Sequence, residues 1–178
     1  DIALLDHVPA PGGSGTQPQR RHPLARGLQR NLLRCHRLAD RQRHATFTIN
    51  GAAVTVRDES ALNGVYLRIE RQVAVELMSG DVFRIGQEIL RYEALQPVGP
   101  QPDGTERLGA ATDGLIGRVS LVTGRESVGN AFPVPVMGIY LGRERGDILF
   151  PEDGYVSGLH CQILVNGTRV SILDVGSS

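Results

Sequence analysis

Short alternating runs of apolar and polar residues dominate the chain, and no window holds the 3.6-residue apolar period of an amphipathic helix. One alternating stretch surrounds Asn50-Gly51, and a second surrounds Asn166-Gly167. Both positions of a two-residue hairpin turn must accept positive φ, which Asn-Gly does readily. The pattern therefore predicts two β-hairpins.

The two hairpins are copies of one another. His160 lies 116 residues after His44, and at this offset the strands and turns of the two hairpins align without a gap. A fixed offset of this kind indicates a tandem repeat. Ser178 aligns with Leu62, so the second copy is expected to be truncated just before the position that corresponds to Asn63.

Further short strands are predicted on both sides of a linker. The predicted strands lie at residues 65–69, 73–78, 79–93, 117–122 and 131–141. Residues 96–114 carry proline and glycine without periodicity and are predicted to be the linker. Pro133 and Pro135 restrict the last of these strands to the edge of a sheet or to a partly irregular run, because proline donates no backbone hydrogen bond. The pattern as a whole predicts an all-β fold.

Composition narrows the function classes. The formal net charge of zero gives no electrostatic argument for binding nucleic acid or an anionic membrane. Cys35 and Cys161 cannot form a disulfide framework and are not spaced as zinc ligands, and no apolar run reaches transmembrane length. We therefore expect a cytoplasmic protein without metal or cofactor. The chain lacks GxGxxG, Walker, HExxH and GxSxG motifs, so we do not expect an enzyme.

The order of several motifs resembles one known family. The stretch "YLGRERGDILFPEDGYVSGLHCQILVNGTRVSILDVGSS" holds Gly-Arg, an apolar strand, Ser-x-x-His, a hairpin and Asp-x-x-Ser. It resembles the first half of a forkhead-associated (FHA) domain. The stretches "HATFTINGAAVTVRDESALNGVYLRI" and "LMSGDVFRIGQEILRYE" resemble the second half, from the histidine through Asn-Gly to the closing strands.

The resemblance implies an antiparallel β-sandwich that binds phosphothreonine peptides in signalling. It assigns Arg143 and Ser157 to the phosphate as charge-assisted hydrogen-bond donors, and Asn63 to the peptide backbone. It also implies that a further set of residues supports the binding loops: Gly142, His160, His44 and Gly64. The partner would be a phosphothreonine-containing protein, either a Ser/Thr kinase or the substrate of one.

Two architectures follow from the partial copies. The four segments are residues 1–43, which do not match the family, residues 44–95 as the back half of a first FHA domain, the linker at 96–114, and residues 115–178 as the front half of a second. The two halves could pair into one complete sandwich, with the redundant first hairpin displaced. Otherwise the chain holds two incomplete domains.

Residues 1–43 depart from the repeat. This stretch has no lysine and eight of the chain's arginines, and at the repeat offset Arg34 and Asp40 stand where the second copy has Phe150 and Val156. Burying unpaired charges is costly, so this segment is not expected to fold as the front half of the sandwich. It is interpreted either as out-of-frame translation of a GC-rich coding region or as an arginine-rich arm that binds RNA or acidic partners.

A competing function is a degenerate FHA scaffold that mediates protein association without phosphate binding. Gly158 stands where the family often has a second arginine or lysine, which favours this alternative. For the individual residues, Arg143 could be a solvated turn residue, Ser157 a loop cap and His160 a hydrogen-bonded structural residue. Intact Gly142-Arg143 and Ser157 favour phosphothreonine binding.

Overall fold

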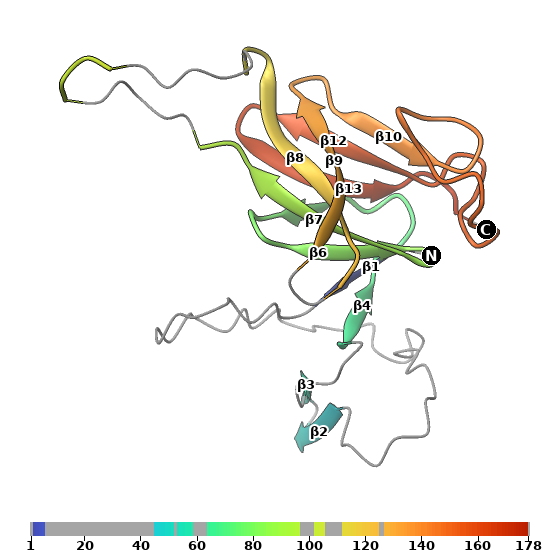
Figure 1. Ribbon diagram of the computed structural model, residues 1–178. Coiled ribbons are helices and arrows are strands. Elements are labelled where there is room, and N and C mark those ends of the chain that lie inside the picture. Colours follow the sequence, from blue (N-terminus) through green and yellow to red (C-terminus); the bar gives the residue numbers. More distant parts are fainter. Residues whose placement is uncertain are drawn as a thin grey trace.

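The computed structural model describes residues 2–5, 45–51, 53–58, 64–96, 102–105, 112–124 and 127–177. These residues form thirteen β-strands in three sheets (Figure 1). They contain no helix, and hence none long and apolar enough to cross a membrane. The sequence prediction of an all-β fold is confirmed.

Two large sheets and one small sheet account for all of these strands. The six-stranded sheet has the order β4 (Tyr66–Arg68), β1 (Ile2–Leu5), β6 (Val82–Ile85), β7 (Glu88–Ala94), β8 (Leu115–Val122) and β9 (Val128–Pro135). The five-stranded sheet has the order β11 (Ile148–Leu149), β10 (Ile139–Gly142), β12 (Cys161–Asn166), β13 (Arg169–Asp174) and β5 (Val75–Leu77). The small sheet pairs β2 (Ala45–Asn50) with β3 (Ala53–Asp58). All neighbouring strands are antiparallel except β10 and β11.

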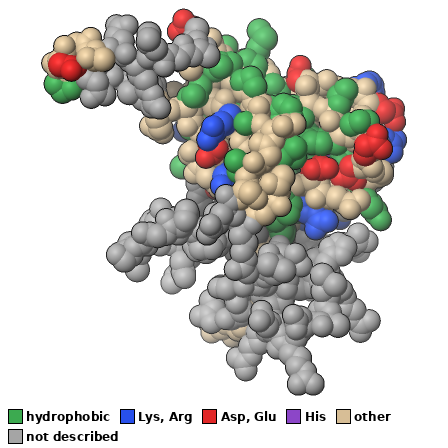
Figure 2. Space-filling model, viewed as in Figure 1, with side chains coloured by type: hydrophobic (Ala, Val, Ile, Leu, Met, Phe, Trp, Pro, Cys, Tyr) green, Lys and Arg blue, Asp and Glu red, His purple; other side chains and the backbone are tan. Residues whose placement is uncertain are grey.

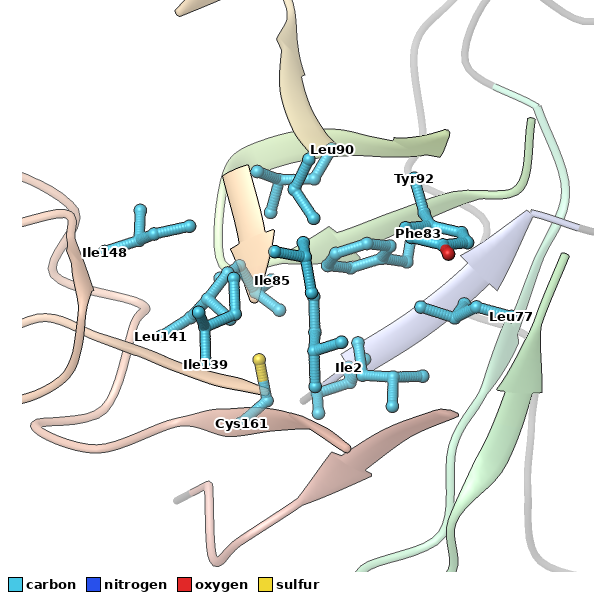
Figure 3. Close-up of a cluster of buried hydrophobic side chains, with 14 of the residues drawn as sticks. Ile2, Leu77, Phe83, Ile85, Leu90, Tyr92, Ile139, Leu141, Ile148 and Cys161 are labelled. Carbon is cyan, nitrogen blue, oxygen red and sulfur yellow. The ribbon is translucent and has the colours of Figure 1, made fainter. Parts of the chain in front are cut away.

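One hydrophobic core lies between the two large sheets. Figure 3 shows Phe83, Ile85 and Leu90 of one sheet facing Leu141 and Cys161 of the other. All five side chains are fully buried. Both partial copies contribute to this core, which is consistent with an FHA-type β-sandwich.

Two strand pairs join the parts of the chain that the sequence assigns to a first and a second copy, which are called the first and second copy below. β7 of the first copy pairs with β8 of the second, and β13 of the second pairs with β5 of the first. Of the two architectures that the sequence left open, the structure therefore has the single sandwich assembled from both copies. The segment boundaries at residues 43, 95 and 114 stay predictions.

β1 was not predicted, because residues 1–43 were interpreted as a segment that does not match the sandwich. Ile2 and Leu4 nevertheless point into the core, with 0% and 9% of their surface exposed. The strand lies between β4 and β6, so it has neighbours on both sides. Four consecutive residues, three of them large and apolar, suffice for a strand when both neighbours supply hydrogen bonds.

The single strand predicted at residues 131–141 is wrong in its extent, because the chain turns within it. Gly138 adopts a positive φ of 78°, and its amide donates to the carbonyl of Pro135 at 2.9 Å, which separates β9 from β10. A left-handed residue of this kind ends a strand and favours glycine. β9 is the edge strand of its sheet, as Pro133 and Pro135 predicted.

Both predicted hairpins are present, but they lie in different places. β12 and β13 form the middle of the five-stranded sheet, between β10 and β5. β2 and β3 pair only with each other among the described strands and lie apart from the sandwich (Figure 1). Of the two hairpins, the second therefore contributes strands to the sandwich and the first does not.

Candidate functional site

Backbone hydrogen bonds hold two loops together at the end of β10. The amide of Arg143 donates to the carbonyl of Ser157 at 2.9 Å. The amides of Glu144 and Arg145 both donate to the carbonyl of Gly158, at 3.1 and 2.8 Å. Three successive backbone groups after Gly142 are thus fixed against the loop that precedes β12.

Gly142 makes this close approach of the two loops possible. A Cβ atom at Gly142 would lie 3.0 Å from Cα of Leu159 and nearer still to the carbonyl oxygens of Arg145 and Gly158. These are backbone atoms that cannot move aside independently. Any side chain at this position would force apart the loops that carry Arg143 and Ser157.

Arg143 projects from this pair of loops and already has an acidic neighbour. Its Nη2 atom lies 2.8 Å from Oε1 of Glu144, and its Nε atom lies 3.3 Å from the same oxygen. The Arg143 side chain is 37% exposed and that of Glu144 is 63% exposed. Figure 2 shows side chains of both charges gathered at the end of the molecule where the C-terminus lies. An anion reaching Arg143 would therefore compete with Glu144.

A small hollow lies beside the Arg143 guanidinium. It has a volume of about 230 Å³ and is lined by Arg143, Gly154, Tyr155, Val156, Ser157 and Gly158. Tyr155 is 72% exposed at this rim. Because Gly158 has no side chain, the lining contains one arginine and no second cation. The polar side-chain donors among the lining residues are the Arg143 guanidinium and the hydroxyls of Ser157 and Tyr155, which are groups that can donate hydrogen bonds to an anion.

His160 braces the loop from beneath. Its Nδ1 atom accepts a hydrogen bond from the amide of Ser157 at 2.9 Å, and its own amide donates to the carbonyl of Leu141 at the same distance. Burial lowers the pKa of His160 to about 4, and Nε2 has no hydrogen-bond partner among the described residues. At neutral pH the imidazole is therefore uncharged and carries its proton on Nε2, which makes it a structural acceptor for the site loop.

The loop that carries Ser157 is also fixed by the other copy. The buried carboxylate of Asp153 accepts hydrogen bonds from the amide of Gln87 at 2.6 Å and from that of Tyr155 at 2.9 Å. At Gly86, whose φ is 55°, a Cβ atom would lie 2.7 Å from the Val156 side chain. The turn between β6 and β7 of the first copy therefore positions the loop of the second.

A second buried carboxylate orders the segment after β13. Asp174 accepts hydrogen bonds from the amides of Gly176 and Ser177, at 2.9 and 2.7 Å, and from the Ser177 hydroxyl. Burial by itself would raise the pKa of Asp174, but these hydrogen bonds lower it below the ordinary value. The Asp174 carboxylate therefore caps the backbone amides of the loop that follows β13. Among the described residues, no group of three or more His, Cys, Asp or Glu side chains could hold a metal ion.

The low pKa of His160 predicts an acid-sensitive fold. The unfolded chain takes up a proton on His160 near pH 6.5, whereas the folded chain resists it down to about pH 4. The unfolding free energy contributed by this group is therefore complete above pH 6.5 and falls by at most about 3 kcal/mol as the pH drops to 4. Urea titrations from pH 4 to 7.5 would measure it.

The control for this prediction is His160→Asn, which keeps an acceptor near the position of Nδ1 and does not titrate. We expect a shallower pH dependence in this variant between pH 4 and 6.5. Asp174 does not interfere, since its pKa is lowered from 3.8 and its contribution is lost only below this window. Equal pH slopes for the two proteins would contradict the assignment.

The structure brings together four of the seven predicted site residues: Gly142, Arg143, Ser157 and His160. Gly64 precedes β4 with a φ of 68°. Asn63 and His44 lie outside the described residues. The sequence prediction did not include Glu144 or Asp153, because Glu144 acts through a side-chain contact with Arg143 and Asp153 through a contact with the distant Gln87.

Comparison with known proteins gives one family match, which lies outside the loops that carry Arg143 and Ser157. The sequence model of the FHA domain family matches residues 39–86, which include β2 to β6. Searches of curated proteins and of solved structures found no significant match. FHA domains are generally phosphothreonine-binding signalling modules, and the family is a binding and adaptor family rather than a catalytic one. The chain is thus similar to a recognition domain over residues 39–86.

Proposed function

We propose that this chain binds phosphothreonine peptides at the loops after β10 and before β12. The observation that carries the proposal is the backbone hydrogen bond between Arg143 and Ser157, which holds together two residues that both line one small hollow. A dianionic phosphate offers three strong acceptor oxygens to such donors. The partner is then a phosphothreonine-containing protein, such as a Ser/Thr kinase or its substrate, and the chain acts as an adaptor.

The electrostatics of the loops support recognition of phosphate over a neutral group. Charge-assisted hydrogen bonds contribute roughly 1.5–3 kcal/mol each, about twice the value for neutral partners. An unphosphorylated threonine would leave the guanidinium paired with Glu144 and gain little. Discrimination between the two peptides is therefore expected to rest mainly on Arg143.

The test uses the full chain and two matched peptide libraries with either phosphothreonine or threonine at a fixed central position. We expect fluorescence polarisation to show at least about tenfold tighter binding of the phosphorylated library, which corresponds to one charge-assisted hydrogen bond. Equal affinity for both libraries would reject phosphothreonine binding.

A second candidate function is favoured by the exposed ion pair and by Gly158. Because Glu144 pairs with the one arginine that lines the hollow, the sandwich could serve in protein association without phosphate. Measurable binding of both libraries with equal affinity would support this scaffold function. Binding of neither library would leave the sandwich without peptide recognition at this surface.

Removing the acidic neighbour should strengthen phosphate binding. In Glu144→Gln the side chain stays nearly the same size but no longer competes for the guanidinium. Exposed ion pairs are worth 0.2–1 kcal/mol, so we expect the phosphopeptide affinity to rise by at most about fivefold. The matched control is Glu152→Gln on the neighbouring loop, which should change affinity less. Unchanged or weaker binding by Glu144→Gln would show that Glu144 does not compete with the peptide.

A further inference from the structure

The hairpin formed by β2 and β3 has the same backbone structure as the hairpin formed by β12 and β13. Each has six registered residue pairs, from Ala45↔Asp58 in the first and from Cys161↔Asp174 in the second. The turn glycines, Gly51 and Gly167, both have a φ of 60°. The two segments therefore form the same hairpin at an offset of 116 residues.

Their surroundings are opposite. β12–β13 is hydrogen-bonded on both sides, by β10 and β5, and its inward residues Ile163 and Ile172 are fully buried. Phe47 and Ile49, which lie on the corresponding side of β2, are 55% and 71% exposed. The first hairpin thus has the same apolar residue pattern as a hairpin that packs on a core, but these side chains are exposed.

We propose that hairpins 45–58 and 161–174 are alternative occupants of one position in the sandwich, between β10 and β5, and that the chain exchanges them. The inward residues of the first hairpin are apolar at each position where those of the second are apolar, and both hairpins end on aspartate. Insertion of either one in the same register places an apolar face on the core, because side chains alternate along a strand.

The connectivity of the chain favours exchange within one molecule. Residue 58 leads through a short segment into β4 and then β5, so the first hairpin is tethered close to the position that it would occupy. At the shared offset, Val56 would take the place of Ile172 opposite Val75. A short tether gives the first hairpin a high effective concentration near this position. Exchange within one molecule is therefore favoured over insertion into another molecule of the protein.

Specific contacts explain why the second hairpin occupies the position in the structure. The Asp174 carboxylate binds the Ser177 hydroxyl and accepts hydrogen bonds from the amides of Gly176 and Ser177. At the offset of 116, Ala61 aligns with Ser177 and cannot supply the hydroxyl. The first hairpin is therefore the minor occupant.

Exchange would also take apart the loops at the hollow. Release of β12 removes the bonds of His160 to Leu141 and to the Ser157 amide, and the first copy has Arg41 at the position of Ser157. The exchanged form would lack the phosphate-binding pair. This consequence rests on the proposed function, whereas the exchange itself does not.

Cross-strand disulfides distinguish the two occupants without any ligand. Glu76 lies directly opposite Ser171 in the structure, and Thr55 is the residue that would replace Ser171 after exchange. In a Cys35→Ser, Cys161→Ala background, Glu76→Cys is combined with either Ser171→Cys or Thr55→Cys. Directly opposite residues of an antiparallel pair lie within disulfide range.

We expect the 76–171 disulfide to form in most molecules on mild oxidation and the 76–55 disulfide to form more slowly, as a monomer. Adding Ile172→Asp, which expels the second hairpin, should accelerate the 76–55 disulfide, and adding Val56→Asp should abolish it. The purified 76–55 protein should still unfold cooperatively in urea, which separates exchange from cross-linking of an unfolded chain.

Three outcomes would overturn the proposal. These are no 76–55 disulfide in monomers, a 76–55 protein that unfolds without cooperativity, and a disulfide that forms only between two chains. The last outcome would show exchange of hairpins between two protein molecules instead. None of these measurements involves a phosphopeptide, so failure of the proposed function would leave them unaffected.

Discussion

Replacing Arg143 by alanine is expected to weaken binding of a phosphothreonine peptide by about 10- to 150-fold. The guanidinium is the only cation that lines the described hollow, and each charge-assisted hydrogen bond that it donates contributes roughly 1.5–3 kcal/mol. The side chain is partly exposed, so its removal creates no core cavity and should leave the unfolding free energy within about 0.5 kcal/mol. Fluorescence polarisation with wild-type and variant chains measures the effect.

The matched control is Arg169→Ala. Arg169 is exposed beside the turn of the second hairpin, at the opposite end of β12 and β13 from the Ser157 loop, so the variant makes the same change in net charge away from the hollow. It should retain nearly wild-type affinity. Equal losses in both variants would mean that the peptide responds to net charge alone, and Arg143 would then have no special role.

The local parts of the fold could be predicted from sequence because their signals are local. Asn50-Gly51 and Asn166-Gly167 determine where each hairpin turns, and alternation determines which side chains share a face. β1 gave no such signal, since a four-residue apolar run has no measurable period and its two partner strands lie more than sixty residues away. Strand partners of this kind depend on the assembled core rather than on any short window.

Some residues of the candidate site could be predicted from the sequence, and others could not. The order of Gly142-Arg143, Ser157 and His160 along the chain predicted the loops that the structure brings together. Asp153 could not be assigned, because its carboxylate acts on the Gln87 amide, 66 residues away in sequence. Glu144 could not be assigned either. It pairs with Arg143, its neighbour in sequence, and this pairing depends on the rotamers of two exposed side chains, which the sequence does not determine.

Across the sandwich, the residues proposed to contact phosphate and the residues that hold their loop come from different parts of the chain. Arg143 and Ser157 belong to the second copy, whereas Gly86 and Gln87 of the first copy fix the loop between β11 and β12. Without the first copy, Asp153 would lose the hydrogen bond from the Gln87 amide. Joining the copies through β7–β8 and β5–β13 is therefore also what positions the candidate site.

The second large effect is expected from Gly142→Ala, which should destabilise the fold by about 3 kcal/mol. Gly142 does not have a positive φ, so backbone strain is not the cause. The added methyl group would instead meet Cα of Leu159 at 3.0 Å and approach two carbonyl oxygens more closely still. Overpacking against atoms that cannot rotate away costs roughly 1–3 kcal/mol, and contact with three backbone atoms places this site at the upper end.

Urea unfolding of Gly142→Ala beside Gly154→Ala tests this steric argument. Gly154 lies on the neighbouring loop, has no atom within 4 Å of its would-be Cβ and lacks a positive φ, so its alanine variant should be neutral or slightly stabilising. We expect a lower midpoint for Gly142→Ala alone, with an unchanged slope because the same surface is exposed on unfolding. Equal midpoints for both variants would mean that the loops after β10 and before β12 can separate at little cost, and a rigid pairing of Arg143 with Ser157 could then no longer explain phosphate recognition.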